Sequence, residues 1–164
     1  MADYWTHFCF DVPATPEQSA WLCMVHSDAC RLLEASENDD GDDLSNPFKL
    51  VATDADAADA GAELAAQFAD DSPGVTLGYA AEVGGVRVRS EDGLGNFDYA
   101  AMLAQLFLRH FMLDDVIPFE WSLTCSVPCP DGYGGGAAVV SRHRIERFDT
   151  WDFVACTVRS ATAA

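Results

Sequence analysis

The chain is poor in basic residues, and this excludes several classes of partner. Its 164 residues include nine Lys and Arg against 27 Asp and Glu, which gives a formal net charge of −18. A phosphate-binding surface needs several cations close together, so we exclude direct binding to nucleic acid. A field this negative also repels an anionic membrane surface. It attracts basic surfaces, and the commonest of these in a cell are the ones that hold DNA or RNA.

The sequence also lacks a long apolar segment. No uninterrupted apolar run reaches the length of a transmembrane helix, and the first residues show no basic region followed by a long apolar run. We therefore expect a cytoplasmic protein without a membrane partner. The six cysteines are then expected to be free thiols in a reducing compartment.

No motif for catalysis, a metal or a cofactor is strong. Cys125 and Cys129 have a spacing that occurs in zinc sites, but with His143 they lack a second pair of ligands. Cys125 beside His110 or His143 would make a thiol nucleophile, which spacing alone does not establish. The glycines at 134–136 enter a predicted strand and lack the Gly-Lys-Ser/Thr ending of a phosphate loop. We expect no metal, no cofactor and no catalytic residue.

What the chain has is enough apolar material for a folded core. Hydrophobic residues make up 49% of the sequence, with four Trp, four Tyr and ten Phe. An acidic disordered protein would be poor in both aliphatic and aromatic residues. We expect one domain over residues 1–164, with an acidic mobile loop at 37–46 and a frayed C-terminus at 160–164.

Hydrophobic periodicity predicts an α+β fold with the order β-α-α-β-β-α-β-β-α, a mostly antiparallel sheet with helices packed on it. The expected strands are 4–12, 75–82, 86–90, 117–124 and 137–141, the last one extended toward 148. The expected helices are 15–35, 54–70, 96–112 and 150–159.

Local signals fix some of these elements in detail. Thr15 and Gln18 predict a capping box, and Asn96 predicts an N-cap. A two-residue turn at Gly84-Gly85 predicts a hairpin in which Glu82 faces Arg87 across the strands. His26, beside an apolar helical stripe, is expected to be a half-buried polar residue rather than a ligand.

The most unusual feature is the stretch from Glu37 to Asp71, which holds eleven acidic residues and one base. In its predicted helix, Asp56, Asp59 and Glu63 are spaced at i, i+3 and i+7, which places three carboxylates on one exposed face. Like charges at this spacing destabilise a helix by a few tenths of a kcal/mol per pair. A row kept at that cost favours a binding surface, and the alternative is a solvated face without a partner.

Three segments of the second half resemble a known family: SEDGLGN at 90–96, FEWSLTCS at 119–126 and YGGGAAVV at 133–140. Together they resemble an uncharacterised family of small bacterial proteins found on plasmids, prophages and other mobile elements. The resemblance covers roughly residues 75–150 and implies no catalytic residue. As a class, small and very acidic proteins of mobile elements are similar to anti-CRISPR and anti-restriction proteins, several of which imitate the charge of DNA.

These features together predict a non-catalytic inhibitor in the cytoplasm of a bacterial host. Its acidic surface would mimic nucleic-acid phosphates and occupy the binding surface of a host defence protein, either a CRISPR effector or a restriction enzyme. The residues predicted to bind this partner are Asp39, Asp40, Asp42, Asp43, Asp56, Asp59 and Glu63.

Two alternatives stay open. The first is a small-molecule or protein-binding adaptor module of a mobile element, with a binding region made of Glu91, Glu120, Trp121 and Tyr133. The second is an enzyme built on a carboxylate cluster of Glu91, Asp92, Asp98 and Glu120.

Overall fold

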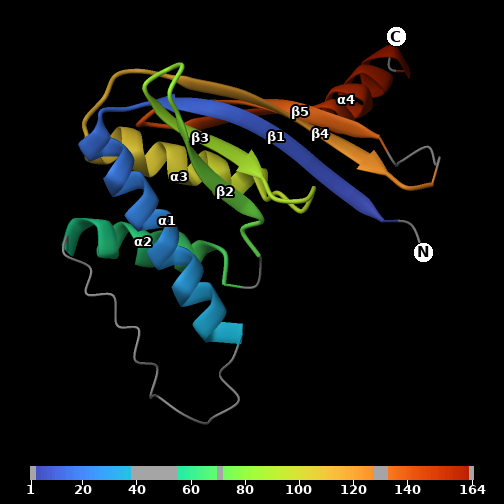
Figure 1. Cartoon of the computed structure of the whole chain (residues 1–164). Coiled ribbons are helices and arrows are strands. Elements are labelled where there is room, and N and C mark those ends of the chain that lie inside the picture. The colour runs from blue at the N-terminus through green and yellow to red at the C-terminus, as the bar shows by residue number, and fades with distance from the viewer. Residues whose placement is uncertain (1–2, 38–54, 70–71, 128–132, 163–164) are drawn as a thin grey trace.

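The computed structural model describes residues 3–37, 55–69, 72–127 and 133–162. These residues form six strands and four helices (Figure 1), and the predicted α+β class is confirmed. The elements in chain order are β1 (Tyr4–Pro13), α1 (Pro16–Glu37), α2 (Ala55–Gln67), β2 (Val75–Ala80), β3 (Gly85–Ser90), α3 (Phe97–His110), β4 (Ile117–Cys125), β5 (Gly134–Val140), β6 (Ile145–Asp149) and α4 (Thr150–Thr162).

The strands form a single open sheet in the order β2-β3-β1-β4-β5-β6, and all neighbouring strands are antiparallel. Helices α1, α2 and α3 lie on the same side of this sheet, and α4 lies at the opposite end of the molecule from α2 (Figure 1). None of the helices within the described residues has the length and apolarity needed to cross a membrane.

Alternation along β1 decides which face of the sheet the helices cover. Phe8, Phe10 and Val12 are buried, and Cys9 between them is exposed, because successive side chains of a strand point to opposite faces. Phe10 stacks on Phe119 of the sheet with ring centroids 4.4 Å apart. The apolar face of the sheet therefore forms one side of the hydrophobic core.

Helix α3 is the central packing element. Tyr99, Leu103 and Phe107 are almost completely buried in the core. The predicted N-cap is confirmed, because the Tyr99 N–H donates to the Asn96 side-chain oxygen at 3.0 Å. This bond satisfies one of the backbone donors that the first turn of a helix leaves without an intrahelical acceptor.

The predicted capping box of α1 is also confirmed. The Gln18 N–H donates to the Thr15 hydroxyl at 3.2 Å, and the Thr15 N–H donates to the Gln18 side-chain oxygen at 2.9 Å. Two backbone donors at the start of the helix are satisfied reciprocally.

Helix α2 is held against α1 by a close approach at a glycine. A Cβ atom on Gly61 would lie 2.9 Å from Asp28 Cβ and 3.1 Å from the Val25 carbonyl oxygen. On the same side of α2, Ala57 and Leu64 are fully buried. These contacts fix the rotation of α2 about its axis and turn its acidic residues outward.

The predicted pairing of Glu82 with Arg87 across the hairpin strands is wrong. The turn spans residues 81–84, and Gly78 is the residue that lies opposite Arg87. The two registers differ by four residues, an even number, so the same side chains face the core in both and the hydrophobic pattern does not distinguish them. Glu82 still approaches Arg87 from the turn, at 3.9 Å.

The end of the chain differs in two further ways from the prediction. The expected extension of the strand at 137–141 is a separate strand, β6, because the chain turns at Ser141. The Ser141 hydroxyl accepts from the Arg144 N–H at 3.2 Å, and the Ser141 N–H donates to the Arg144 carbonyl at 2.9 Å. Helix α4 ends at Thr162, three residues beyond the predicted end at 159.

Candidate functional site

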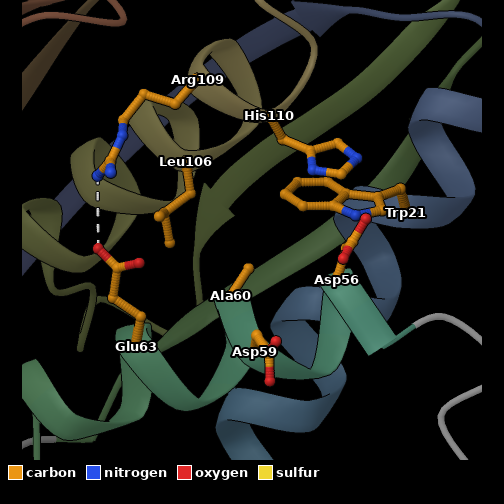
Figure 2. A pocket seen from close by; sticks show the side chains of 8 residues that line it. All are labelled: Trp21, Asp56, Asp59, Ala60, Glu63, Leu106, Arg109 and His110. Carbon is orange, nitrogen blue, oxygen red and sulfur yellow. Dashed lines mark hydrogen bonds and ion pairs between the residues drawn. The ribbon is translucent and has the colours of Figure 1, made fainter.

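The acidic residues of α2 line a groove between three helices (Figure 2). Its volume is about 360 Å³. The residues around it are Asp56, Asp59, Ala60 and Glu63 from α2, Leu106, Arg109 and His110 from α3, and Trp21 from α1. All three acidic residues are exposed, so their charges are accessible to a partner.

The helical period places these carboxylates in a row. With a rise of about 1.5 Å per residue, Asp56 and Asp59 are separated by roughly 4.5 Å along the axis, and Asp59 and Glu63 by roughly 6 Å. Three negative charges therefore follow one edge of the groove over about 10 Å.

Arg109 of α3 faces this row. Arg109 Nη1 lies 3.4 Å from Glu63 Oε1, and both side chains are about half exposed. An ion pair in such a position contributes only about 0–1 kcal/mol, because water and salt screen it. Arg109 offsets part of the charge at one end of the row, and an incoming cation can replace it at little cost.

The other end of the groove is aromatic. The Trp21 and His110 rings stack with centroids 4.2 Å apart and an interplanar angle of 14°. Phe111 packs edge-on against Trp21. The Trp21 indole is buried, and its N–H has no hydrogen-bond acceptor among the described residues. The acidic row therefore lies beside a stacked pair of aromatic rings.

Most arginines of the chain are already bound by its own carboxylates. Of the eight arginines, all of which the structure describes, six form ion pairs within the chain. The pairs are Arg31–Asp28, Arg87–Asp11, Arg109–Glu63, Arg142–Asp114, Arg144–Glu146 and Arg147–Asp98. Positive charge is thus used for internal contacts, and the large acidic excess is displayed on the surface.

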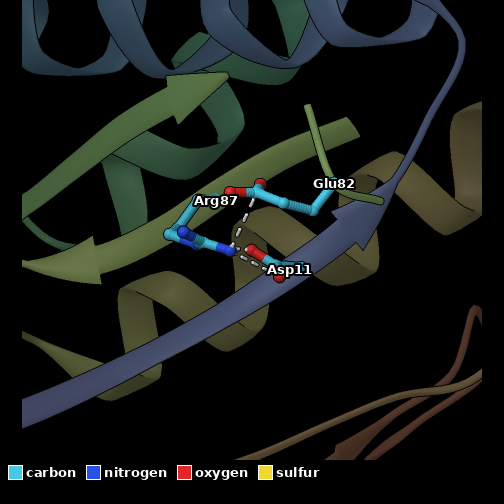
Figure 3. Close-up of polar contacts among 3 residues, drawn as sticks. All are labelled: Asp11, Glu82 and Arg87. Atoms are coloured by element: carbon cyan, nitrogen blue, oxygen red, sulfur yellow. Dashed lines mark hydrogen bonds and ion pairs between the residues drawn. The ribbon is translucent and has the colours of Figure 1, made fainter. Parts of the chain in front are cut away.

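The pair between β1 and β3 shows this internal use most clearly (Figure 3). The Arg87 guanidinium donates to both carboxylate oxygens of Asp11, at 2.8 and 3.0 Å. These hydrogen bonds lower the pKa of Asp11, and the same contact raises the pKa of Arg87. A two-pronged contact of this kind holds a defined geometry across the two strands.

The groove presents carboxylate acceptors on Asp56, Asp59 and Glu63. Exposed carboxylates accept hydrogen bonds from guanidinium and ammonium groups. Within the residues that the structure describes, no three His, Cys, Asp or Glu side chains are grouped so that they could hold a metal ion.

A half-buried cysteine and a half-buried histidine of α1 face α3. The His26 ring nitrogen is 2.9 Å from the Tyr99 hydroxyl and 3.7 Å from Cys30 Sγ. Burial lowers the pKa of His26 and raises the pKa values of Cys30 and Tyr99. A thiol nucleophile needs a thiolate beside a charged histidine. The shifts instead favour the neutral imidazole of His26 and the neutral thiol of Cys30. His26 is half-buried, as predicted.

The predicted partner-binding residues fall into two groups. Asp56, Asp59 and Glu63 lie together along the groove. The other four, Asp39, Asp40, Asp42 and Asp43, lie outside the described residues, as does most of the expected loop at 37–46.

The alternative binding region does not form one surface. Trp121 is only 5% exposed and stacks on Phe97 with ring centroids 4.2 Å apart. Glu120, its neighbour on the same strand, is exposed on the opposite face of the sheet. Tyr133 instead lines a second groove, beside α4.

Sequence reasoning missed three residues of the groove: Trp21, Arg109 and His110. No local motif marks Trp21 or His110 as groove residues, and no local pattern connects Arg109 with a glutamate 46 positions earlier. Only the packing of the three helices brings them together.

Comparison with known proteins supplies no relative from which a role could be transferred. The chain matches no protein-family model, no curated protein and no solved structure.

Proposed function

We propose that the protein is a non-catalytic inhibitor from a mobile element that acts through its acidic surface. The surface would occupy the DNA- or RNA-binding site of a host defence protein, either a CRISPR effector or a restriction enzyme. The observation that carries the proposal is the exposed row of Asp56, Asp59 and Glu63 on one edge of the groove.

The spacing of this row supports the proposal. One strand of DNA presents a negative charge about every 3.4 Å along the helix axis. The α2 carboxylates present three charges at a mean axial spacing of about 5 Å, so the two charge densities are of the same order. Lys and Arg side chains that contact successive phosphates could therefore contact successive carboxylates.

The distribution of positive charge also favours a basic protein over a nucleic acid as the partner. Six arginines are paired within the chain, so an incoming nucleic acid would meet little accessible cationic surface. A basic protein would meet a net charge of −18. Electrostatic attraction of this kind accelerates association and weakens as salt screens it.

Arg109 has a defined place in this proposal. It lies beside the row and pairs with Glu63 through an exposed contact. When the partner binds, one of its cations forms an ion pair with Glu63 in place of Arg109, and Arg109 moves toward the solvent. Arg109 thus keeps the carboxylate oriented in the free protein, at a small energetic cost to binding.

Affinity capture tests the proposal. The immobilised protein is exposed to lysate of a bacterium that carries CRISPR and restriction systems, and bound proteins are eluted with increasing salt. We expect a nucleic-acid-binding nuclease that leaves at moderate salt and that free duplex DNA displaces. A partner that resists both salt and DNA would contradict the proposal.

The adaptor alternative has one supporting observation. Tyr133 lines a groove of about 390 Å³ at the base of α4, on an apolar surface that the acidic row does not include. A partner held there would be insensitive to the charge of α2, which separates the two functions experimentally.

A further inference from the structure

Helix α4 is attached to the molecule mainly by its first turn. Gly135 donates its N–H to the Thr150 hydroxyl at 3.2 Å, and Phe153 packs on Phe148 of β6 with ring centroids 5.5 Å apart. Every side chain from Trp151 to Ser160 is nevertheless exposed. Figure 1 shows the helix extending past the end of the sheet.

The exposed side of α4 is apolar. Trp151, Val154 and Val158 are 41%, 53% and 55% exposed, and their spacing of i, i+3 and i+7 places them on one side of the helix. A helix of 13 residues is marginal in water without a packed face. Such a stripe indicates that another surface covers the helix.

The apolar surface is large enough to matter. Tyr133 and Trp151, which line one groove together with Val154, are each about half exposed. An aromatic side chain buries about 150–250 Å² when covered, so these two alone leave on the order of 150–250 Å² of apolar surface. A stable interface needs roughly 800 Å² from each partner, and Val154 and Val158 extend the patch toward that value.

The charge of this region identifies the kind of partner it fits. Residues 141–164 contain four arginines and three acidic residues, a net charge of +1, and the rest of the chain carries −19. A second copy of this acidic chain would be repelled by most of the surface but can approach here. The acidic residues on the other elements repel those of the second copy. Salt screens this repulsion where the elements of the two copies are farther apart than a Debye length of about 8 Å.

We propose that α4 pairs with α4 of a second copy of the chain, in antiparallel orientation about a two-fold axis near Ala155. In this arrangement Asp152 faces Arg159 of the partner subunit, and Trp151 faces the partner's Val158. Ala155 at the crossing lets the axes approach to the usual 8–10 Å. Each contact occurs twice, as a two-fold interface requires.

The edge strand beside α4 is a poorer candidate for the interface. Three of the five residues of β6 are charged: Glu146, Arg147 and Asp149. Charges of this kind protect a sheet edge from pairing with another chain, and a two-fold pairing centred on the strand would place Arg147 opposite its own copy. Helix α4 is therefore the surface that we assign to the dimer.

The dimer does not depend on the proposed function, but it has a consequence for it. Helix α2 lies at the other end of the molecule (Figure 1), so the two acidic rows of a dimer would both remain accessible and face away from each other.

The mass in solution tests the pairing. Analytical ultracentrifugation of the full chain at micromolar concentrations should give twice the 17.7 kDa of one chain. Val158→Asp should raise the dimer dissociation constant by roughly 100-fold, because a buried contact is replaced by a desolvated charge. Val83→Asp, an exposed valine in the β2–β3 turn, is the matched control and should leave the dimer intact.

Cysteine cross-linking gives a test that does not require a destabilising substitution. In a Cys156→Ser background, Ala155→Cys should form a disulfide between subunits on mild oxidation, whereas Thr157→Cys, on the other side of the helix, should not. A monomer at all concentrations, a dimer unaffected by Val158→Asp, or equal cross-linking at both positions would overturn the proposal. A monomer whose α4 variants lose a captured host protein would overturn it in favour of a different occupant.

Discussion

At the scale of single residues, half-buried His26, which contacts Cys30 and the buried Tyr99, gives the protein a pH dependence. Burial holds the pKa of His26 below its ordinary value of 6.5. The unfolded chain therefore takes up a proton at a higher pH than the folded chain does. Between the two pKa values the unfolded state binds more protons, so stability rises with pH in that range.

The first prediction concerns His26→Gln. In the natural chain, the contribution of His26 to the free energy of unfolding is complete above pH 6.5. It is lost as the pH falls through the lower folded pKa, by about 1.4 kcal/mol for each pH unit that separates the folded and unfolded pKa values. Urea unfolding at a series of pH values should show a weaker decrease between about pH 7.5 and 5.5 in the variant.

The ion pair of Asp11 and Arg87 provides an internal reference for this measurement, because it titrates in a different pH range. Asp11, whose pKa is lowered by Arg87, loses its contribution only as the pH falls below the ordinary aspartate range near 3.8. That loss is common to both proteins and lies outside the histidine range. If the natural chain and His26→Gln showed the same slope above pH 5, the buried histidine would not be the titrating group.

At the scale of elements, the contact between α1 and α2 positions the acidic row. The second prediction is that Gly61→Leu, which leaves the charge unchanged, destabilises the protein by about 1–3 kcal/mol. The physical reason is the space at Gly61, where even a Cβ would lie 2.9 Å from Asp28 Cβ. Urea unfolding measures the change, and partner binding should weaken as α2 is displaced.

The neighbouring residue of α2 provides the matched control. Ala62 is exposed, so Ala62→Leu adds the same bulk to the same helix on its solvent side and should change stability by no more than about 0.5 kcal/mol. Equal effects of the two substitutions would mean that the close approach of α1 and α2 at Gly61 does not hold α2 in place.

The elements show which features a sequence can predict. The cap at Asn96 and the box at Thr15 and Gln18 were predictable because all the partners lie within three positions of one another. The turn at Ser141 was missed, since it is closed by a serine hydroxyl and has no glycine or proline to mark it.

The candidate site was predictable only in part. The row of Asp56, Asp59 and Glu63 follows from helical spacing alone, because these residues share one face of one helix. The opposing wall does not, since Arg109 and His110 come from α3 and Trp21 comes from α1. Contacts between distant segments depend on how helices pack, and the local pattern of either helix carries no record of that packing.

At the scale of the whole molecule, charge and apolar surface are separated. The acidic row lies on α2, and the exposed apolar stripe lies on α4 at the other end. The two surfaces have different physical signatures. Binding through α2 should weaken with salt, whereas apolar pairing through α4 should persist in salt, because the burial of apolar area does not depend on screening.

The central claim is that the charge of the α2 row, rather than the net charge of the chain, inhibits a host nuclease. The third prediction uses two variants with the same total charge. One is Asp56→Lys, Asp59→Lys and Glu63→Lys. The other is Glu91→Lys, Asp115→Lys and Glu120→Lys, which reverses three exposed carboxylates elsewhere and includes two residues of the alternative region.

The deciding measurement is phage survival in cells that carry the captured defence system and express each variant at equal, folded levels. Reversal of the row creates like-charge contacts with a basic partner, which cost several kcal/mol. We expect inhibition to be abolished by the α2 variant and retained by the control. Inhibition that survives reversal of Asp56, Asp59 and Glu63, or that both variants lose equally, would contradict the account.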